Sequence, residues 1–215
     1  MAKRALVVAG GWDGHEPKQA TERFLPFLKA NGFEVIVRDS MAAYTDKALM
    51  DSLSLVVPCW TMGSFEGTQE RGLLDAIASG VGIAGWHGGM GDSFRSNCDY
   101  QFMVGGQFVG HPGNIMPHKI HITDWDDPIT AGIADFTLVS EQYYMHVDPS
   151  NKVLATSTFT GKDVAWIDGV VMPVVWKRRW NKGRVFYASF GHVAKDFDSV
   201  EARTIMERGM LWAAR

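Results

Sequence analysis

The stretch Val81-Gly-Ile-Ala-Gly-Trp-His-Gly-Gly89 decides the fold. Its first six residues form a short apolar run, which is typical of a strand buried on both faces of a parallel sheet. The glycines around His87 predict a sharp turn directly after that strand, with the histidine at its apex and a helix beginning beyond it. The stretch therefore predicts a strand, a turn and a helix of an α/β protein, with an imidazole projecting from the turn.

The chain before this stretch repeats the alternation of strand and helix. Apolar runs predict three earlier strands, at Ala5–Ala9, Glu34–Val37 and Leu55–Pro58. The segments between strands predict helices from Pro17 to a stop at Asn31-Gly32, over Thr45–Leu53, and from a cap at Thr68 to Ser79. Pro26 falls inside the first helix and should kink or interrupt it. This alternation predicts a mostly parallel sheet with helices on both faces.

The second half of the chain is rich in predicted strands. These are Pro117–Thr123, Thr137–Ser140, Val153–Thr158, Val171–Lys177 and Arg184–Ser189. A hairpin connection over Arg178–Gly183 is expected between the last two. Asp198 and Glu201 resemble the capping box of a final helix that packs on the sheet. No linker or repeat divides the sequence, so residues 1–215 are expected to form a single domain.

Composition restricts the class of partner. The net charge of -3 leaves no basic excess for a nucleic-acid backbone. No segment approaches the roughly 20 apolar residues that cross a bilayer, and the two cysteines cannot build a disulfide framework. We therefore expect a cytoplasmic protein that acts on a small molecule and does not bind nucleic acid or membrane. Base rates favour a homo-oligomer.

Three histidines follow predicted strands, at the edge where a parallel sheet forms its ligand crevice. His15 follows the first strand, His87 lies at the turn quoted above, and His192 follows the last strand. An imidazole titrates near neutrality, so His87 and His192 are candidate acid/base groups, with Glu141 as a candidate partner. The turn also suits a ligand-binding or metal-binding histidine, or one that merely caps the next helix.

A second set of side chains could contact a substrate, namely Trp12, His15, Arg95, His111, Tyr143 and His146. The aromatic rings could stack on a sugar, although such rings more often pack in a core or rim. Arg95 could bind a polar substrate or, equally, form a surface salt bridge. His118 and His121 lie three apart on a predicted strand and therefore on opposite faces, which makes them poorer candidates.

The sequence leaves the cofactor open. No two histidines have the i, i+4 helical spacing of a zinc protease. A divalent metal such as zinc would bind only if loops bring its ligands together. No nucleotide cofactor is indicated.

Nearly the whole chain resembles the trehalose-utilisation ThuA-like family, within the class I glutamine amidotransferase-like superfamily. The resemblance rests on the loop with His15, Gly85–Gly89, Tyr100–Phe108 with His111-Pro112, Glu141 with Tyr143, and Pro173–Trp176 through Gly183–Tyr187 to Gly191-His192. It implies a flavodoxin-like fold and places His87 where an amidotransferase carries its nucleophilic cysteine, so glutaminase activity is not expected. It also implies a role in the breakdown of disaccharides and their 3-keto derivatives.

Two functional hypotheses follow. In the first, the protein is an enzyme in which His87 and His192 transfer a proton next to a sugar carbonyl, leading to isomerisation or elimination, while Glu141 orients one of them. Hydrolysis of a keto-glycoside belongs to the same hypothesis, and a bound divalent metal could polarise the carbonyl instead. In the second, the protein is a non-catalytic sugar-binding or regulatory module. A cysteine enzyme is least favoured, because neither Cys59 nor Cys98 lies on a glycine-flanked turn.

Overall fold

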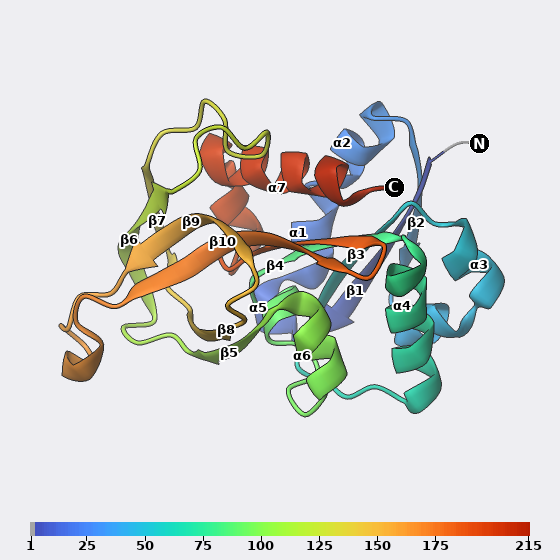
Figure 1. Ribbon diagram of the computed structural model, residues 1–215, viewed down its shortest axis with the longest axis horizontal. Coiled ribbons are helices and arrows are strands. Elements are labelled where there is room, and N and C mark those ends of the chain that lie inside the picture. The colour runs from blue at the N-terminus through green and yellow to red at the C-terminus, as the bar shows by residue number, and fades with distance from the viewer. Residues whose placement is uncertain (1–2) are drawn as a thin grey trace.

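The computed structural model describes residues 3–215, and a nine-stranded sheet forms its centre (Figure 1). The strands lie in the order β2-β1-β3-β4-β11-β10-β9-β6-β7. Their bounds are β1 Lys3–Gly11, β2 Phe33–Arg38, β3 Leu55–Thr61, β4 Gly82–Trp86, β6 Ile115–Ile122, β7 Phe136–Glu141, β9 Lys152–Thr158, β10 Val171–Trp180 and β11 Gly183–Ala188. Every strand predicted from the sequence is therefore present.

The sheet has a parallel part and an antiparallel part. Strands β2, β1, β3, β4 and β11 pair in parallel, in the order of the flavodoxin-like fold, with β11 in the fifth place. Strands β10, β9, β6 and β7 continue the sheet through antiparallel pairs. The expected α/β fold with a β-rich second half is confirmed. The short strands β5 (Gly106–Gly110) and β8 (Tyr144–Val147) form a separate pair that the sequence did not predict.

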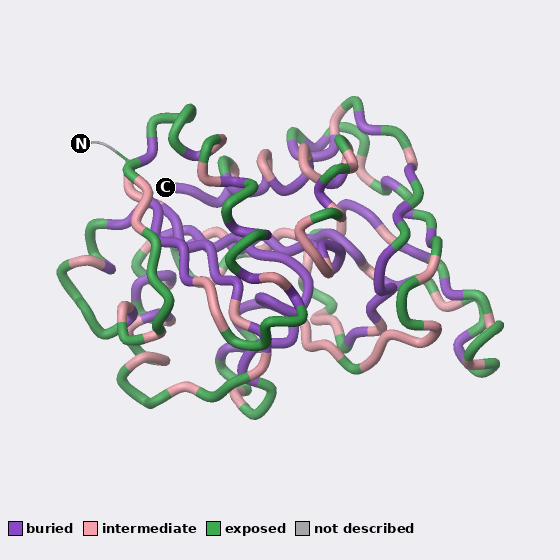
Figure 2. Tube along the Cα trace, turned by 180° about the vertical axis from the view of Figure 1, so that it is seen from behind, coloured by how far each residue is buried: buried purple, intermediate pink, exposed green. Residues whose placement is uncertain are grey.

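Helices cover both faces of the sheet, as expected, and two buried clusters fill the space beneath them. Figure 1 shows α1, α2 and α7 on one side of the sheet and α4 and α6 on the other. The bounds are α1 Pro17–Glu22, α2 Leu25–Ala30, α3 Lys47–Ser52, α4 Gly67–Ser79, α5 His87–Gly91, α6 Cys98–Val104 and α7 Val200–Ala213. The central strands are buried, while exposed residues lie mainly at the periphery (Figure 2).

The interruption at Pro26 is confirmed, whereas two predicted helix caps are wrong. The first predicted helix divides into α1 and α2, and Pro26 lies in the first turn of α2, where its missing N–H costs least. Helix α4 is capped by Glu66 and Gln69 rather than by Thr68, because these two side chains exchange hydrogen bonds with the backbone. Helix α7 is capped by the Ser199 hydroxyl rather than by Asp198.

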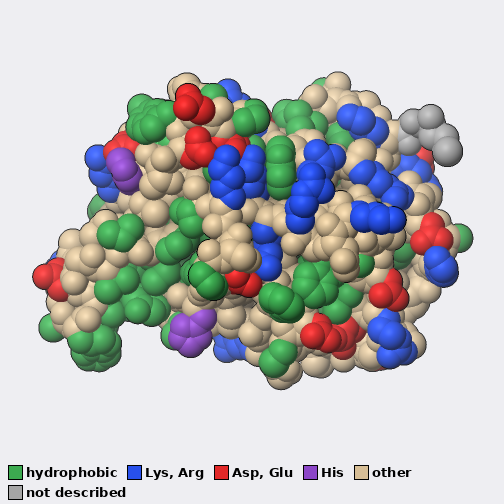
Figure 3. Space-filling model, in the orientation of Figure 1, with side chains coloured by type: hydrophobic (Ala, Val, Ile, Leu, Met, Phe, Trp, Pro, Cys, Tyr) green, Lys and Arg blue, Asp and Glu red, His purple; other side chains and the backbone are tan. Residues whose placement is uncertain are grey.

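An apolar arm projects from the sheet between β9 and β10. It spans residues 159–170, and its Trp166 is 86% exposed. Figure 3 shows hydrophobic side chains gathered at the left end of the molecule, on the side of this arm. Within residues 3–215, no helix is long and apolar enough to span a membrane.

Candidate functional site

The candidate site lies at the carboxyl ends of the parallel strands, the usual ligand edge of such a sheet. His15 follows β1, His87 follows β4, and His192 follows β11. Glu141 ends β7, which comes from the antiparallel part. The ring centroid of His15 is 4.8 Å from that of His87 and 5.0 Å from that of His192. The fold therefore brings the three predicted histidines and the predicted carboxylate together.

The turn after β4 has the sharp geometry that the sequence predicted. The backbone of His87 lies in the left-handed region, with φ of 43°. Residues other than glycine rarely adopt this conformation without support from their surroundings. A Cβ on Gly88 would lie 2.3 Å from Cε1 of His15, and one on Gly89 would lie 2.9 Å from Cα of Cys59. The Tyr187 hydroxyl donates a 3.0 Å hydrogen bond to the His87 carbonyl. Close packing on every side therefore fixes the imidazole at the apex.

The hydrogen bonds of His87 define where its protons lie. Its Nδ1 is 2.7 Å from the Ser189 carbonyl oxygen, which can only accept, so Nδ1 carries a proton. Its Nε2 lies 3.1 Å from Oε2 of Glu141. The ring also stacks on Tyr143, with centroids 3.8 Å apart. Nε2 is thus the atom that His87 presents to the carboxylate.

Glu141 is the centre on which the imidazoles converge. His192 Nδ1 lies 3.3 Å from the same Oε2 atom, and His111 Nε2 lies 3.7 Å from Oε1. The contact from His192 is poorly aligned, so its buried Nδ1 has no hydrogen-bond partner among the described residues. Two further carboxylates hold the loop: Asp196 accepts from the backbone N–H of His192 at 2.8 Å, and Glu16 accepts from that of Ala194 at 3.0 Å.

The surroundings give these groups different affinities for protons. Burial lowers the pKa of His15 to about 3 and also lowers the pKa of His87. Burial acts to raise the pKa of Glu141, but His192 and His87 outweigh it and hold that pKa well below its usual range. Burial acts to lower the pKa of His192, yet the adjacent Glu141 raises it overall. Among these imidazoles, His192 therefore holds a proton most strongly.

A cavity of about 180 Å³ opens beside Glu141. Asp92 and Arg95 form its polar part, because the carboxylate accepts two hydrogen bonds from the guanidinium, at 2.5 and 2.8 Å. Its lining comprises Trp12, His15, Met62, Asp92, Arg95, Phe108, His111, Glu141 and Tyr143. Aromatic rings and paired hydrogen-bonding groups thus line one small space, and it contains most of the predicted substrate-binding residues. Of the predicted catalytic residues only Glu141 lines it; His192 does not, and His87 is fully buried against Glu141 and Tyr143.

The structure does not bring His146 into this cavity. His146 lies on β8, opposite Gln107, with its side chain exposed. Sequence reasoning also missed four residues of the site, namely Thr61, Met62, Asp92 and Phe108. Thr61, whose hydroxyl lies 2.7 Å from Nδ1 of His15, lay beyond the predicted end of its strand. Asp92 gave one usable signal, its spacing of three residues from Arg95, which suits an ion pair on one helical turn.

The donor set fits a divalent ion such as zinc. His15, His87, Glu141 and His192 each offer one ligand atom, and these atoms lie within 4.8 Å of one another. The Nδ1 of His87 donates to a carbonyl, the usual arrangement for a histidine that binds metal through its other nitrogen. The unpartnered Nδ1 of His192 offers a further free donor atom. Loops do bring these groups together, as metal binding would require.

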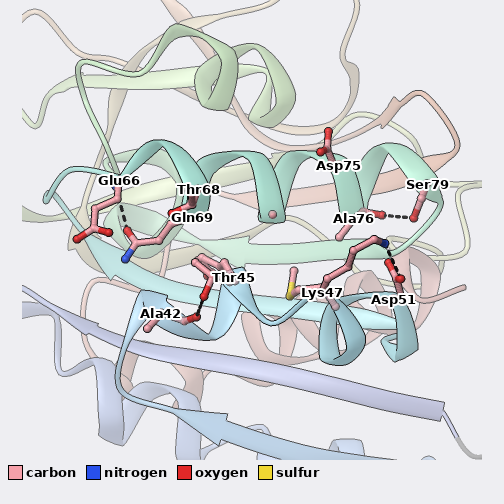
Figure 4. Close-up of a pocket in the computed structure, with 13 residues that line it drawn as sticks. Ala42, Thr45, Lys47, Asp51, Glu66, Thr68, Gln69, Asp75, Ala76 and Ser79 are labelled. Carbon is pink, nitrogen blue, oxygen red and sulfur yellow. Dashed lines mark hydrogen bonds and ion pairs between the residues drawn. The ribbon is translucent and has the colours of Figure 1, made fainter.

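A larger cavity, of about 730 Å³, lies between α3 and α4 but carries no comparable chemistry (Figure 4). Several of its polar side chains are bonded to each other or to nearby backbone: Lys47 pairs with Asp51 at 2.6 Å, and the Thr45 hydroxyl donates to the Ala42 carbonyl. Its lining includes neither histidine nor cysteine. We therefore place the candidate site at the histidine cluster.

Comparison with known proteins defines the family. Residues 4–213 match the family model ThuA, described as trehalose utilisation. The chain therefore belongs to the ThuA family. No curated protein matches it.

Solved structures show the same fold at low sequence identity. A ThuA-like protein from Bacteroides uniformis is 17% identical with a TM-score of 0.82, covering 98% of this chain and 91% of that one. A ThuA-like protein from Parabacteroides merdae is 15% identical with a TM-score of 0.79, covering 99% and 90%. A protein from Salmonella typhimurium, described as cytoplasmic, is 12% identical with a TM-score of 0.68, covering 99% and 100%.

Proposed function

We propose that this protein is an enzyme of sugar utilisation that transfers a proton next to the carbonyl of a sugar or keto-sugar. The observation that carries the proposal is the convergence of His87, His192 and His111 on the Glu141 carboxylate beside an aromatic cavity. Membership of a family described as trehalose utilisation supports the substrate class. A cytoplasmic location is part of the proposal, supported by the description of the Salmonella relative.

The two imidazoles take different roles. His87 holds a proton on Nδ1 through the Ser189 carbonyl, so its Nε2 has the free electron pair of a general base. His192 retains its proton beside Glu141 and is the general acid. Neighbouring groups whose pKa values are pushed apart are the usual sign of such a division.

The cavity holds the sugar ring for this step. Trp12, Phe108 and Tyr143 offer ring faces to the C–H groups, while Asp92 and Arg95 offer hydrogen-bonding partners to hydroxyls. His87 removes the proton from the carbon next to the carbonyl, and the electron pair left behind forms an enolate. His192 protonates the enolate oxygen to give an enediol and then takes the proton of the adjacent hydroxyl, and return of the proton from His87 to the former carbonyl carbon completes an isomerisation. Departure of a substituent with the proton from His192 completes an elimination.

Glutaminase activity is not part of the proposal. Histidine occupies the apex of the turn, and an imidazole does not form the stable acyl intermediate of a thiolate. Cys59 lies nearby, but burial raises the pKa of its thiol to about 12. Its side chain therefore stays protonated and is not an activated nucleophile.

A metal would change the roles of these side chains without moving the site. His15, His87, Glu141 and His192 would hold the ion, and it would polarise the sugar carbonyl when bound. Elemental analysis of the purified protein, followed by turnover measured after chelation, decides between the roles. Stoichiometric metal with loss of turnover on its removal would assign the four side chains as ligands. Full turnover by metal-free protein would assign proton transfer to the imidazoles.

Product analysis with trehalose and 3-keto-trehalose tests the proposed function. We expect the wild-type protein to convert the keto-sugar, and His87→Ala to lower the turnover number about 10²- to 10⁴-fold. His121→Ala is the matched control, because His121 is an exposed histidine on β6 that pairs with Asp135. Full turnover by His87→Ala would overturn the acid/base assignment. Saturable binding in calorimetry without any product would instead indicate a sugar-binding module.

A further inference from the structure

Strand β2 leaves one edge of the nine-stranded sheet free. It is the outermost strand on the parallel side and, within residues 3–215, pairs only with β1 (Figure 1). The backbone N–H and C=O groups on its outer edge therefore have no partner strand in that part of the chain. Such an edge can bind an added strand, because the main chain supplies hydrogen bonds and the side chains decide which strand is bound.

The middle of β2 is apolar and only partly covered. Val35 and Ile36 are half-buried, and Val37 is 47% exposed. Proline and lysine, which often protect a free edge from pairing, do not occur in Phe33–Arg38. The centre of the strand therefore presents an apolar surface to a partner.

Two opposite charges flank this apolar centre at equal distances. Glu34 lies two residues before Ile36, and Arg38 lies two residues after it. If two copies of β2 pair antiparallel about Ile36, Glu34 of each copy lies opposite Arg38 of the other. Val35 of each copy then lies opposite Val37 of the other. Opposite charges and apolar side chains are the cross-strand pairs that stabilise antiparallel strands, so β2 is complementary to itself in this register.

Both charged side chains are accessible for contacts with a second copy. Arg38 is exposed and forms no ion pair within residues 3–215, and its guanidinium donates to the adjacent Val37 carbonyl at 2.9 Å. Glu34 contacts Arg4 at 3.3 Å, but the Glu34 side chain remains 57% exposed. A second cation can therefore approach the Glu34 carboxylate from outside.

A groove beside β2 offers space for the side chains of a paired strand. It has a volume of about 610 Å³ and lies between β2 and the start of α3, where Asp46 and Leu49 line it. Ile36 packs against the buried cluster that contains Met50 of α3, so it lies on the face of the sheet that α3 covers. Arg38 lies on the same face, two residues along the strand. The Ile36 and Arg38 side chains of a second copy would therefore lie over this groove.

We propose that the protein forms a two-fold symmetric dimer in which the β2 strands of two copies pair antiparallel about Ile36. Two-fold symmetry presents the same surface from both copies, as a self-complementary strand requires. The dimer joins two nine-stranded sheets into one continuous sheet. The inference is independent of the proposed function, because β2 contributes no residue to the histidine cluster or to the cavity beside Glu141.

Analytical ultracentrifugation of the full-length protein tests the dimer. A concentration series that reaches about 100 µM covers dissociation constants in the micromolar range, and the wild-type mass should approach twice that of one chain. Arg38→Glu places like charges opposite each other at both ends of the apolar centre. We expect it to weaken the dimer by about 10- to 100-fold, and Glu34→Arg to do the same.

Mixing the two charge variants tests the register. In a mixed pair, one chain carries two acidic side chains and the other carries two basic ones, so both charged contacts are attractive again. An equimolar mixture of Arg38→Glu and Glu34→Arg should therefore dimerise more tightly than either variant alone. Arg179→Glu, the same charge change at an exposed position on β10, is the matched control and should leave the dimer unchanged.

The other outcomes would overturn the proposed dimer. They are a wild-type protein that stays monomeric throughout the series, an oligomer that Arg38→Glu does not weaken, and a mixture that associates no better than its components. Val37→Lys supplies a further variant should a charge variant fail to fold by circular dichroism. It should weaken the dimer by placing an ammonium group opposite Val35 of the second copy, and an unchanged dissociation constant for folded Val37→Lys would also count against the inference.

Discussion

The parallel and antiparallel parts of the sheet contribute different chemistry to one site. The parallel part supplies His15, His87 and His192, each in a loop directly after a strand. The antiparallel part supplies Glu141, the carboxylate that these imidazoles approach. The proton transfer that we propose therefore needs groups from both parts of the sheet.

The two parts also hold their residues in different ways. His87 is fixed locally, by a left-handed turn, two adjacent glycines and a carbonyl one strand away. Glu141 depends on long-range pairing, because it lies opposite Ile115 in the β6–β7 ladder at the outer edge of the sheet. Substitution of Glu141 should therefore impair the chemistry alone. Substitutions in the turn after β4 should impair both the packing and the chemistry.

The largest effect should come from Glu141→Gln. The amide lacks the charge that raises the pKa of His192, so the general acid loses its proton at lower pH. We expect the turnover number for 3-keto-trehalose to fall about 10²- to 10⁴-fold, with the alkaline limb of the pH–rate profile moving to lower pH. The exposed Glu22 provides a matched control, Glu22→Gln, which should leave both unchanged. If Glu141→Gln kept its rate and pH profile, the antiparallel part of the sheet would have no role in the chemistry.

Gly88→Ala should give the next largest effect, on stability as well as turnover. The added Cβ would lie 2.3 Å from Cε1 of His15 and 3.0 Å from the Tyr143 hydroxyl, so buried rings must shift. We expect the free energy of unfolding in urea to fall by about 1–3 kcal/mol. Gly67→Ala, which meets only the end of the Arg71 side chain at 3.6 Å, should be neutral or slightly stabilising. Similar losses in both variants would show that the turn is not a special position.

The parallel part was largely predictable because its signals are local. A strand buried on both faces reads as a continuous apolar run, and the glycines around His87 reveal a turn whose backbone needs small neighbours. The grouping of His15, His87 and His192 follows from one rule, that the carboxyl ends of parallel strands meet at a common edge. Sequence reasoning could therefore locate the imidazoles.

The rest depends on distant pairing and on neighbours that local patterns do not reveal. Strands β5 and β8 are short, contain glycine or exposed residues, and within residues 3–215 form a ladder only with each other. His146 consequently lies on a strand rather than in a loop. Phe108, whose strand was not predicted, could not be placed in the cavity. Only the folded structure shows that Asp92 pairs with Arg95 at the wall of the cavity.

A smaller effect should appear in the pH dependence of stability, with one buried histidine in each part. Burial lowers the pKa of His15 in the parallel part and of His118 on β6 below their ordinary value. The unfolded chain then binds more protons than the folded one below about pH 6.5, so stability should fall as the pH drops. His192 has the opposite sign, because its raised pKa contributes stability that is lost as the pH rises.

Urea unfolding at pH 7 and pH 5 measures this balance. We expect wild-type protein to be less stable at pH 5, and His15→Gln and His118→Gln each to reduce the difference by up to about 1.4 kcal/mol per pH unit. His121→Gln, on the exposed face of β6, serves as the comparison. Unaltered pH dependence in both buried variants would show that neither imidazole is held neutral by the fold.

The smallest effect concerns α7, a C-terminal helix that packs on β4 and β11 of the parallel part. The Ser199 hydroxyl accepts a hydrogen bond from the Ala202 N–H at 3.2 Å, whereas Asp198 contacts Arg23 at the surface. Ser199→Ala should lower the free energy of unfolding by about 1 kcal/mol, because it leaves a helix N–H unpaired. Asp198→Ala should cost about 0.2–1 kcal/mol, since an exposed ion pair contributes little. If Asp198→Ala proved the more damaging, the capping box read from the sequence would be the better description of this helix start.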